Sequence, residues 1–279
     1  LEYADGDKLY VPLEQVDRIT RYVGPDGDKP RLTRLNTADW TRATNKARKN
    51  AKKLAFDLVD LYTRRSSITG IACPPDTRPP LDEPELVERL VRRSESIGLA
   101  RVFPVGALTQ QLAGEKLSEM VGLSRAGCIA FSQATKPIFD TQVLLRAMQY
   151  AATFGYAIRL QPQDHYLARD GVAHDGEVAS RLGLSGIPVC AETLAISTAL
   201  HLAEETGVRL HLSKLSSGAG VALVREARNN GVKVSCDVAI HHLHLSETDI
   251  GFFDSHARFD PPLRSATDQE ALRSAVAEG

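Results

Sequence analysis

From residue 68 onward, short apolar runs alternate with longer stretches in which apolar residues recur every three or four positions. The short runs predict β-strands and the longer stretches predict α-helices. The predicted strands are Ile68–Cys73, Ala100–Pro104, Cys128–Phe131, Ala157–Leu160, Val208–Leu212 and Lys233–Val238. The helices predicted between them are Glu83–Ser96, Lys116–Ser124, Thr141–Thr153, Ala191–Thr206 and Ala219–Asn230. This order favours a parallel sheet covered by helices, either an open α/β fold or a (β/α)8 barrel that is incomplete at about six units.

The first 65 residues show a different pattern. Two strand-like runs, Leu1–Ala4 and Lys8–Val11, flank an Asp-Gly-Asp segment that is typical of a hairpin turn. From Trp40 to Leu61, apolar residues recur at helical spacing, and Lys and Arg residues occupy the other face. We therefore expect short strands followed by a long basic helix. Such a face is usually only solvated, so binding to nucleic acid is the less favoured interpretation.

Charge separates the same two segments. Residues 1–65 carry 14 Lys and Arg against 10 Asp and Glu, whereas residues 66–279 carry 20 against 25. This asymmetry indicates two modules of different origin. Because no apolar run reaches about 18 residues, we expect no membrane span. The four cysteines form no CxxC pair, which favours free thiols in the cytoplasm over a zinc ribbon.

Short motifs along the second segment occur together in one enzyme family. They include Pro74-Pro75-Asp76-Thr77, Gly106-Ala107-Leu108-Thr109, Phe131-Ser132, Leu215-Ser216-Ser217, His241-His242-Leu243 and Pro261-Pro262-Leu263-Arg264. Each motif is weak alone, but together they make residues 70–279 resemble the dihydroorotases of the amidohydrolase superfamily. The resemblance implies an α/β fold with a (β/α)8 barrel that hydrolyses or closes the dihydroorotate ring at a zinc centre.

The resemblance also locates the family's metal-binding positions, and this chain has other residues there. Gln133 stands where the family has Asp, Gln161 begins the segment where it has His-x-Glu-Asp, and Lys214 replaces a ligand His. The His-x-His pair of the family's first strand has no counterpart before residue 70. A neutral amide is a poor zinc ligand, and an ammonium group repels the cation. We therefore expect no metal cofactor and no catalytic residues.

Two positions that contact substrate in the family are also altered. Asp76 and Asp260 replace Asn, and a carboxylate there would repel anionic dihydroorotate. This pattern resembles the non-catalytic dihydroorotase homologues of bacteria, which are structural partners of aspartate transcarbamoylase. It implies binding to the catalytic subunit of that enzyme, in pyrimidine biosynthesis.

The alternative is an active dihydroorotase-type hydrolase of a cyclic amide with an unusual zinc site. His242 and His244 are its candidate ligands, because both rings would share one face if they lay on a strand. However, they align with a part of the family that does not bind the metal. Zinc binding is therefore the less favoured interpretation of this pair.

Residues 1–65 resemble the RNA-polymerase-interacting, CarD-like domain of transcription-repair coupling factor, through Leu1–Pro12, Asp17–Gly24, Trp40 and the basic helix. The resemblance implies a remnant of a small Tudor-like β-barrel. It also implies pairing with a strand of the RNA polymerase β subunit. The residues that would make this contact are Leu1, Glu2, Tyr3, Leu9, Tyr10 and Val11.

Both segments match only part of the domain that they resemble. The opening strands of the CarD-like domain would precede Leu1, and the late catalytic Asp of the dihydroorotases would follow Gly279. The chain also lacks an initiator Met, so we expect it to begin inside a longer protein. We expect a chimeric or truncated chain whose two parts join within residues 66–80.

Overall fold

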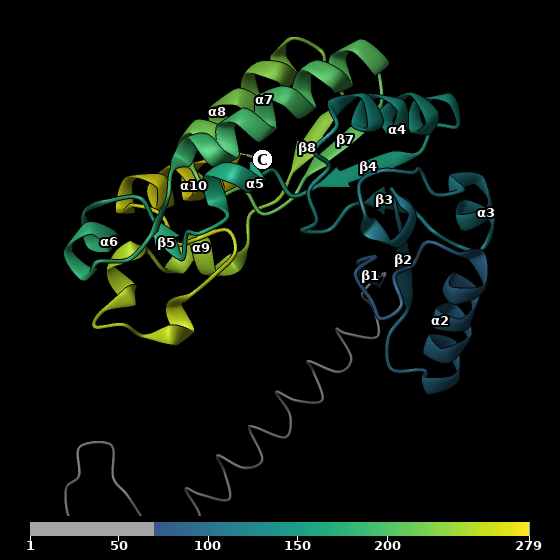
Figure 1. The fold of residues 1–279 in the computed structure, drawn as a ribbon, viewed down its shortest axis with the longest axis horizontal. Coiled ribbons are helices and arrows are strands. Elements are labelled where there is room, and N and C mark those ends of the chain that lie inside the picture. The colour runs from purple at the N-terminus through teal and green to yellow at the C-terminus, as the bar shows by residue number, and fades with distance from the viewer. Residues whose placement is uncertain (1–69, 279) are drawn as a thin grey trace, which may run out of the picture. The chain divides into compact units, whose positions relative to one another are not determined.

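The computed structural model describes residues 70–278, whose centre is a parallel β-sheet. Six strands lie side by side in the order β1-β2-β3-β4-β7-β8, which follows the order of the chain (Figure 1). They are β1 (Ile71–Cys73), β2 (Val102–Ala107), β3 (Ala130–Ser132), β4 (Ala157–Leu160), β7 (Arg209–Leu212) and β8 (Val234–Cys236). The connection from β4 to β7 contains a separate parallel pair, β5 (Ala173–His174) and β6 (Gly186–Ile187).

Helices connect the strands and cover one face of the sheet. The longer ones are α2 (Pro84–Ile97), α4 (Thr141–Thr153), α7 (Val189–Thr206), α8 (Gly218–Asn229) and α10 (Ala266–Glu278). The shorter ones are η3 (Gln110–Leu112), α3 (Met120–Arg125), α5 (His165–Ala168), α6 (Glu177–Leu182), α9 (Ile240–His244), η4 (Glu247–Ile250) and η5 (Ser255–Ala257). Helices α4, α7 and α8 pack against β4, β7 and β8 and against one another (Figure 1).

Helix ends follow local capping rules. The Asp140 side chain accepts a hydrogen bond from the Gln142 N–H at the start of α4, at 2.8 Å. The Ser217 hydroxyl accepts one from the Gly220 N–H at the start of α8, at 3.0 Å. Helix α7 ends at Gly207, whose φ of 67° lies in the left-handed region that glycine adopts without strain.

The two faces of the sheet differ in polarity, and this difference positions the site. Ile158 and Leu210 are buried in the hydrophobic core beneath the helices. Their neighbours along the strands point to the opposite face, because side chains alternate along a strand. On that face Arg159 of β4 is in register with His211 of β7, which is in register with Ser235 of β8. A polar row therefore crosses three adjacent strands.

The predicted α/β fold with a partial barrel is confirmed, and the six predicted strands are present, one with the predicted bounds and five with shifted ends. The strand interpretation of His242 and His244 is wrong, because both lie on helix α9. The sequence patterns did not predict α5, α6, α10 or the β5–β6 pair. The predicted Tudor-like remnant and basic helix lie outside the described residues. Within residues 70–278, no helix has the length and apolar character needed to cross a bilayer.

Candidate functional site

The carboxyl ends of parallel strands meet at one edge of the sheet, where α/β proteins usually place their binding sites. Here the segments after β1, β4 and β7 enclose a cleft of about 270 Å³. Asp76, Gln161 and Lys214, three positions selected from the sequence, line this cleft together. The other polar residues that line it are Ser132, Thr135, Arg159 and Ser213.

The two remaining positions lie beside the cleft. Gln133 lines a neighbouring groove of about 240 Å³. Asp260 lines a third cavity, of about 310 Å³. Gln161 lines all three, so the degenerate family positions gather around this one side chain.

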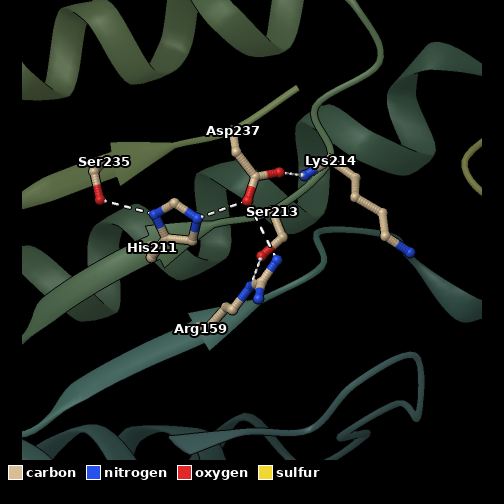
Figure 2. A network of polar contacts seen from close by, with 6 residues as sticks. All are labelled: Arg159, His211, Ser213, Lys214, Ser235 and Asp237. Carbon is tan, nitrogen blue, oxygen red and sulfur yellow. Dashed lines mark hydrogen bonds and ion pairs between the residues drawn. The ribbon is translucent and has the colours of Figure 1, made fainter. Parts of the chain in front are cut away.

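A hydrogen-bonded network centred on Asp237 connects β4, β7 and β8 (Figure 2). Asp237 Oδ2 accepts from His211 Nε2 at 2.9 Å and from Arg159 Nη2 at 3.3 Å. Its Oδ1 accepts from the backbone N–H of Lys214 at 2.7 Å. Arg159 Nε in turn donates to Ser213 Oγ at 2.5 Å. The network therefore holds the Arg159 guanidinium and the Lys214 backbone in place.

Asp237 is the ionised group at the centre of this network. Burial alone would raise the pKa of Asp237, but the hydrogen bonds from His211 and Lys214 and the charges of His211 and Arg159 outweigh it and lower the pKa. The carboxylate is therefore ionised and acts only as an acceptor, so His211 Nε2 carries a hydrogen. In the neutral ring, Nδ1 then accepts from Ser235 Oγ, 2.9 Å away. The sequence reasoning missed this network, although polar residues alternating with leucine along β7 were a signal.

Lys214 brings a positive charge to the cleft. Its φ of 57° lies in the left-handed region, which non-glycine residues rarely adopt. The hydrogen bond from its backbone N–H to Asp237 stabilises that conformation. The side chain lines the cleft, and its charge adds to the effect of burial in lowering the pKa of His241.

Gln133 is almost completely buried, with 2% of its surface exposed. Its Oε1 accepts a hydrogen bond from the Thr109 hydroxyl at 3.0 Å. Its Nε2 has no hydrogen-bond partner among residues 70–278. The side chain is therefore held as a hydrogen-bonding amide beneath the strand ends.

His242 and His244 do not face a common point. His242 is buried, and its Nε2 lies 3.2 Å from the Pro262 carbonyl oxygen. Burial, and then the charge of His241, lowers the pKa of His242 to about 4, so the ring is neutral at physiological pH. His244 is exposed. On a helix, residues two positions apart point in different directions, which separates the two rings.

The donor set around the strand ends does not fit zinc. Zinc sites in proteins use thiolate, imidazole and carboxylate ligands. Within residues 70–278, no group of three or more such side chains lies close enough together to hold a metal ion. Residues 1–69 contain no histidine or cysteine in sequence. The amides of Gln133 and Gln161 and the ammonium of Lys214 occupy the positions where the family implies ligands.

A second polar centre lies where α7, α8 and the segment before α10 meet. The buried Glu192 carboxylate accepts from the Ser216 N–H at 2.9 Å and the Ser217 N–H at 3.1 Å. It also accepts from both serine hydroxyls. The buried Arg264 donates to Ser216 Oγ at 3.1 Å and to the Ile187 carbonyl at 2.6 Å. This centre ties three segments together and has no place in the sequence prediction.

Comparison with known proteins relates the described fold to one family. A family model described as dihydro-orotase-like matches residues 45–219. A dihydroorotase-like protein of Pseudomonas aeruginosa is 45% identical over 211 residues, which cover 76% of this chain and 50% of that protein. A dihydroorotase of Citrifermentans bemidjiense is 36% identical over the same length, again with 50% of that protein covered. The chain thus spans about half the length of the curated relatives it matches.

Solved structures show the same fold at low sequence identity. The L-hydantoinase of Arthrobacter aurescens matches with a TM-score of 0.61 and 23% identity, over 76% of this chain and 48% of that one. At the other end of the sequence, residues 1–23 match a model described as the CarD-like/TRCF RID domain. That match includes the predicted polymerase contacts Leu1, Glu2, Tyr3, Leu9, Tyr10 and Val11, which lie outside the described residues.

Proposed function

Because this chain belongs to the dihydro-orotase-like family, we propose that it is a non-catalytic member of that family and a structural partner of aspartate transcarbamoylase in pyrimidine biosynthesis. The proposal places it in the cytoplasm, where its four cysteines, all free, match a reducing environment. Its resemblance to the non-catalytic homologues rests on the altered family positions, and the name of the Pseudomonas aeruginosa relative agrees with it.

The observation that carries the proposal is the state of Lys214. A zinc-dependent hydrolase needs a metal-bound water as nucleophile, and the ligands must be neutral imidazole or anionic. Lys214 instead presents an ammonium group to the cleft, and its backbone is bonded to the carboxylate of Asp237. The Asp237 carboxylate already accepts hydrogen bonds from Arg159, His211 and the Lys214 backbone. Its negative charge is therefore balanced by groups of this chain. These residues support the non-catalytic role that we propose.

Size-exclusion chromatography of the full chain with the purified catalytic subunit of aspartate transcarbamoylase tests this function. We expect a shared peak of higher mass than either protein alone. The chain should show no dihydroorotase activity in the same preparation. Separate elution of the two proteins at a concentration of roughly tens of micromolar, at which a complex with a Kd of about 1 μM would be largely formed, would contradict the proposal.

The active enzyme is the alternative that the dihydroorotases among the relatives favour. In that case zinc would be the cofactor, and ring opening of dihydroorotate would be measurable and sensitive to chelators. The present donor set does not support it, because two amides and an ammonium are not zinc ligands.

Binding to RNA polymerase is a second candidate function, favoured by the match of residues 1–23. We rank this binding below binding to the carbamoyltransferase, because the match that supports it covers only residues 1–23. A pull-down of the purified polymerase β subunit with the full chain tests it. Retention equal to that of an intact CarD-like domain would reverse the order of the two candidates.

A further inference from the structure

The groove that contains Gln133 is chemically distinct from the polar cleft beside it. Residues of α4, of α7 and of the segment that leads from β4 into α5 line it. Its apolar walls include Ile138, Phe139, Leu144, Leu160 and Leu194. A largely apolar groove with a few polar groups is the usual form of a binding site.

Gln133, which lines this groove, carries a buried donor without a partner in the described part of the chain. The Thr109 hydroxyl accepts from the Gly114 N–H at 2.9 Å, so its single hydrogen is free to donate to Gln133 Oε1. This arrangement orients the amide and leaves Nε2 as the group without a partner among residues 70–278. Buried donors in folded proteins nearly always have a hydrogen-bond partner, so an orphaned one calls for an explanation. A bound carbonyl oxygen would satisfy it.

Gln163 supplies the complementary acceptor. It lines the same groove, and its Oε1 is buried without a hydrogen-bond partner in the described part of the chain. An occupant that satisfies both glutamines must offer one acceptor and one donor. The polypeptide main chain offers both at every residue except proline.

The rim of the groove indicates a macromolecular occupant. Phe139 and Leu194 are 57% and 53% exposed. Tyr166 is exposed as well, and its ring centroid lies 5.4 Å from that of Phe139. Exposed aromatic and aliphatic side chains gathered around one groove are typical of protein interfaces. A ligand enclosed by the groove alone would leave this rim uncovered.

We propose that the groove is a docking site for an extended segment of a partner protein. The segment places a large apolar side chain against the groove walls, and its main chain bonds to Gln133 and Gln163. The identity of the partner as aspartate transcarbamoylase rests on the proposed function, whereas the peptide chemistry of the site does not.

The first arm of the test measures binding of the full chain to the purified catalytic subunit of aspartate transcarbamoylase. The double variant Phe139→Ala, Leu194→Ala removes the rim and should weaken binding about tenfold or more. Phe252→Ala is the matched control, because Phe252 is 90% exposed and does not line the groove. If the wild type binds the catalytic subunit and the double variant binds it equally well, the groove is not the docking site. The proposed function would stand in that case.

The second arm is independent of that partner. The probe is N-acetyl-phenylalanine N-methylamide, which carries an apolar ring between two peptide groups, and saturation-transfer NMR reports its binding. We expect roughly millimolar affinity for the wild type, as small ligands allow, and at least about fivefold weaker binding to Gln133→Met. Gln149→Met, an exposed position on α4, is the matched control and should bind like the wild type. No binding of the probe, or equal binding by Gln133→Met, would overturn the proposal.

The combination of arms separates the possible occupants. If the probe binds in a way that depends on Gln133 but the carbamoyltransferase does not bind, the groove is a peptide-binding site and the proposed function is refuted. If sedimentation shows that the wild type self-associates and the double variant does not, the occupant is a second copy of this chain. That result would overturn docking of a different protein.

Discussion

Replacing Glu192 with Gln should destabilise the fold markedly although the two side chains have the same shape. The carboxylate accepts four hydrogen bonds, from the backbone N–H and the hydroxyl of both Ser216 and Ser217. A glutamine amide has one oxygen, and its NH2 group faces donors on the other side. A serine hydroxyl can turn to accept from that group, but a backbone N–H cannot, so one buried N–H loses its partner.

The magnitude follows from these contacts. An unsatisfied buried donor costs about 1–3 kcal/mol, and hydrogen bonds to a charged group contribute about 1 kcal/mol more than neutral ones. Loss of the negative charge also removes the stronger of the two carboxylate charges, those of Glu192 and Asp268, that compensate the buried Arg264. We therefore expect the free energy of unfolding to fall by about 3 kcal/mol, against a usual total of about 5–15 kcal/mol.

Urea unfolding of the full chain, followed by circular dichroism at a helix wavelength, measures this loss. With a slope of about 3 kcal/mol per molar urea, the midpoint should fall by about 1 M. Glu204→Gln is the matched control, because Glu204 is exposed on the same helix, and it should leave the midpoint unchanged. A midpoint for Glu192→Gln equal to that of the control would refute the interpretation of this centre as a stabilising hydrogen-bond network.

Three further predictions follow from the site. Because the folded-state pKa of His242 is lowered to about 4, its neutral form is favoured in the fold, so stability should fall as pH drops from about 6.5 toward 4. His242→Phe should flatten that part of the pH profile of the urea midpoint. Asp237, whose folded-state pKa is lowered, contributes stability that is present above its unfolded pKa and is lost as pH falls through the folded value. Asp237→Asn should remove this acid dependence, and an unchanged profile would contradict the network. The purified chain should contain well under one zinc per molecule by elemental analysis. Stoichiometric zinc that chelators remove would refute the interpretation of Gln133, Gln161 and Lys214 as replaced metal ligands.

The order of strands and helices could be predicted because it depends on local patterns. An apolar run of strand length and a helical repeat each lie within one short stretch of sequence, as in Ala157–Leu160 and Thr141–Thr153. Both elements appear in the structure with these bounds. The proximity of Asp76, Gln161 and Lys214 around one cleft also has a simple cause, because parallel strands bring their carboxyl ends to one edge of the sheet.

Features that depend on distant contacts could not be predicted. The two-residue strands β5 and β6 are too short to produce a periodic pattern. His242 and His244 would share one face if they lay on a strand, and so short a segment does not distinguish a strand from the helix observed. The partners of Glu192 lie 24 and 25 residues away, and those of Asp237 lie on β4, on β7 and in the segment after β7. The orphaned amide of Gln133 is defined only by its surroundings in the fold.

The rate of dihydroorotate ring opening, measured with added zinc at neutral and mildly alkaline pH, tests the central claim most directly. If the strand ends hold amides and an ammonium in place of zinc ligands, the rate with the full chain should equal that of the buffer at every zinc concentration. The variant His242→Ala, His244→Ala should behave in the same way. A chelator-sensitive rate above the buffer, abolished in that variant, would contradict the account and establish an active hydrolase.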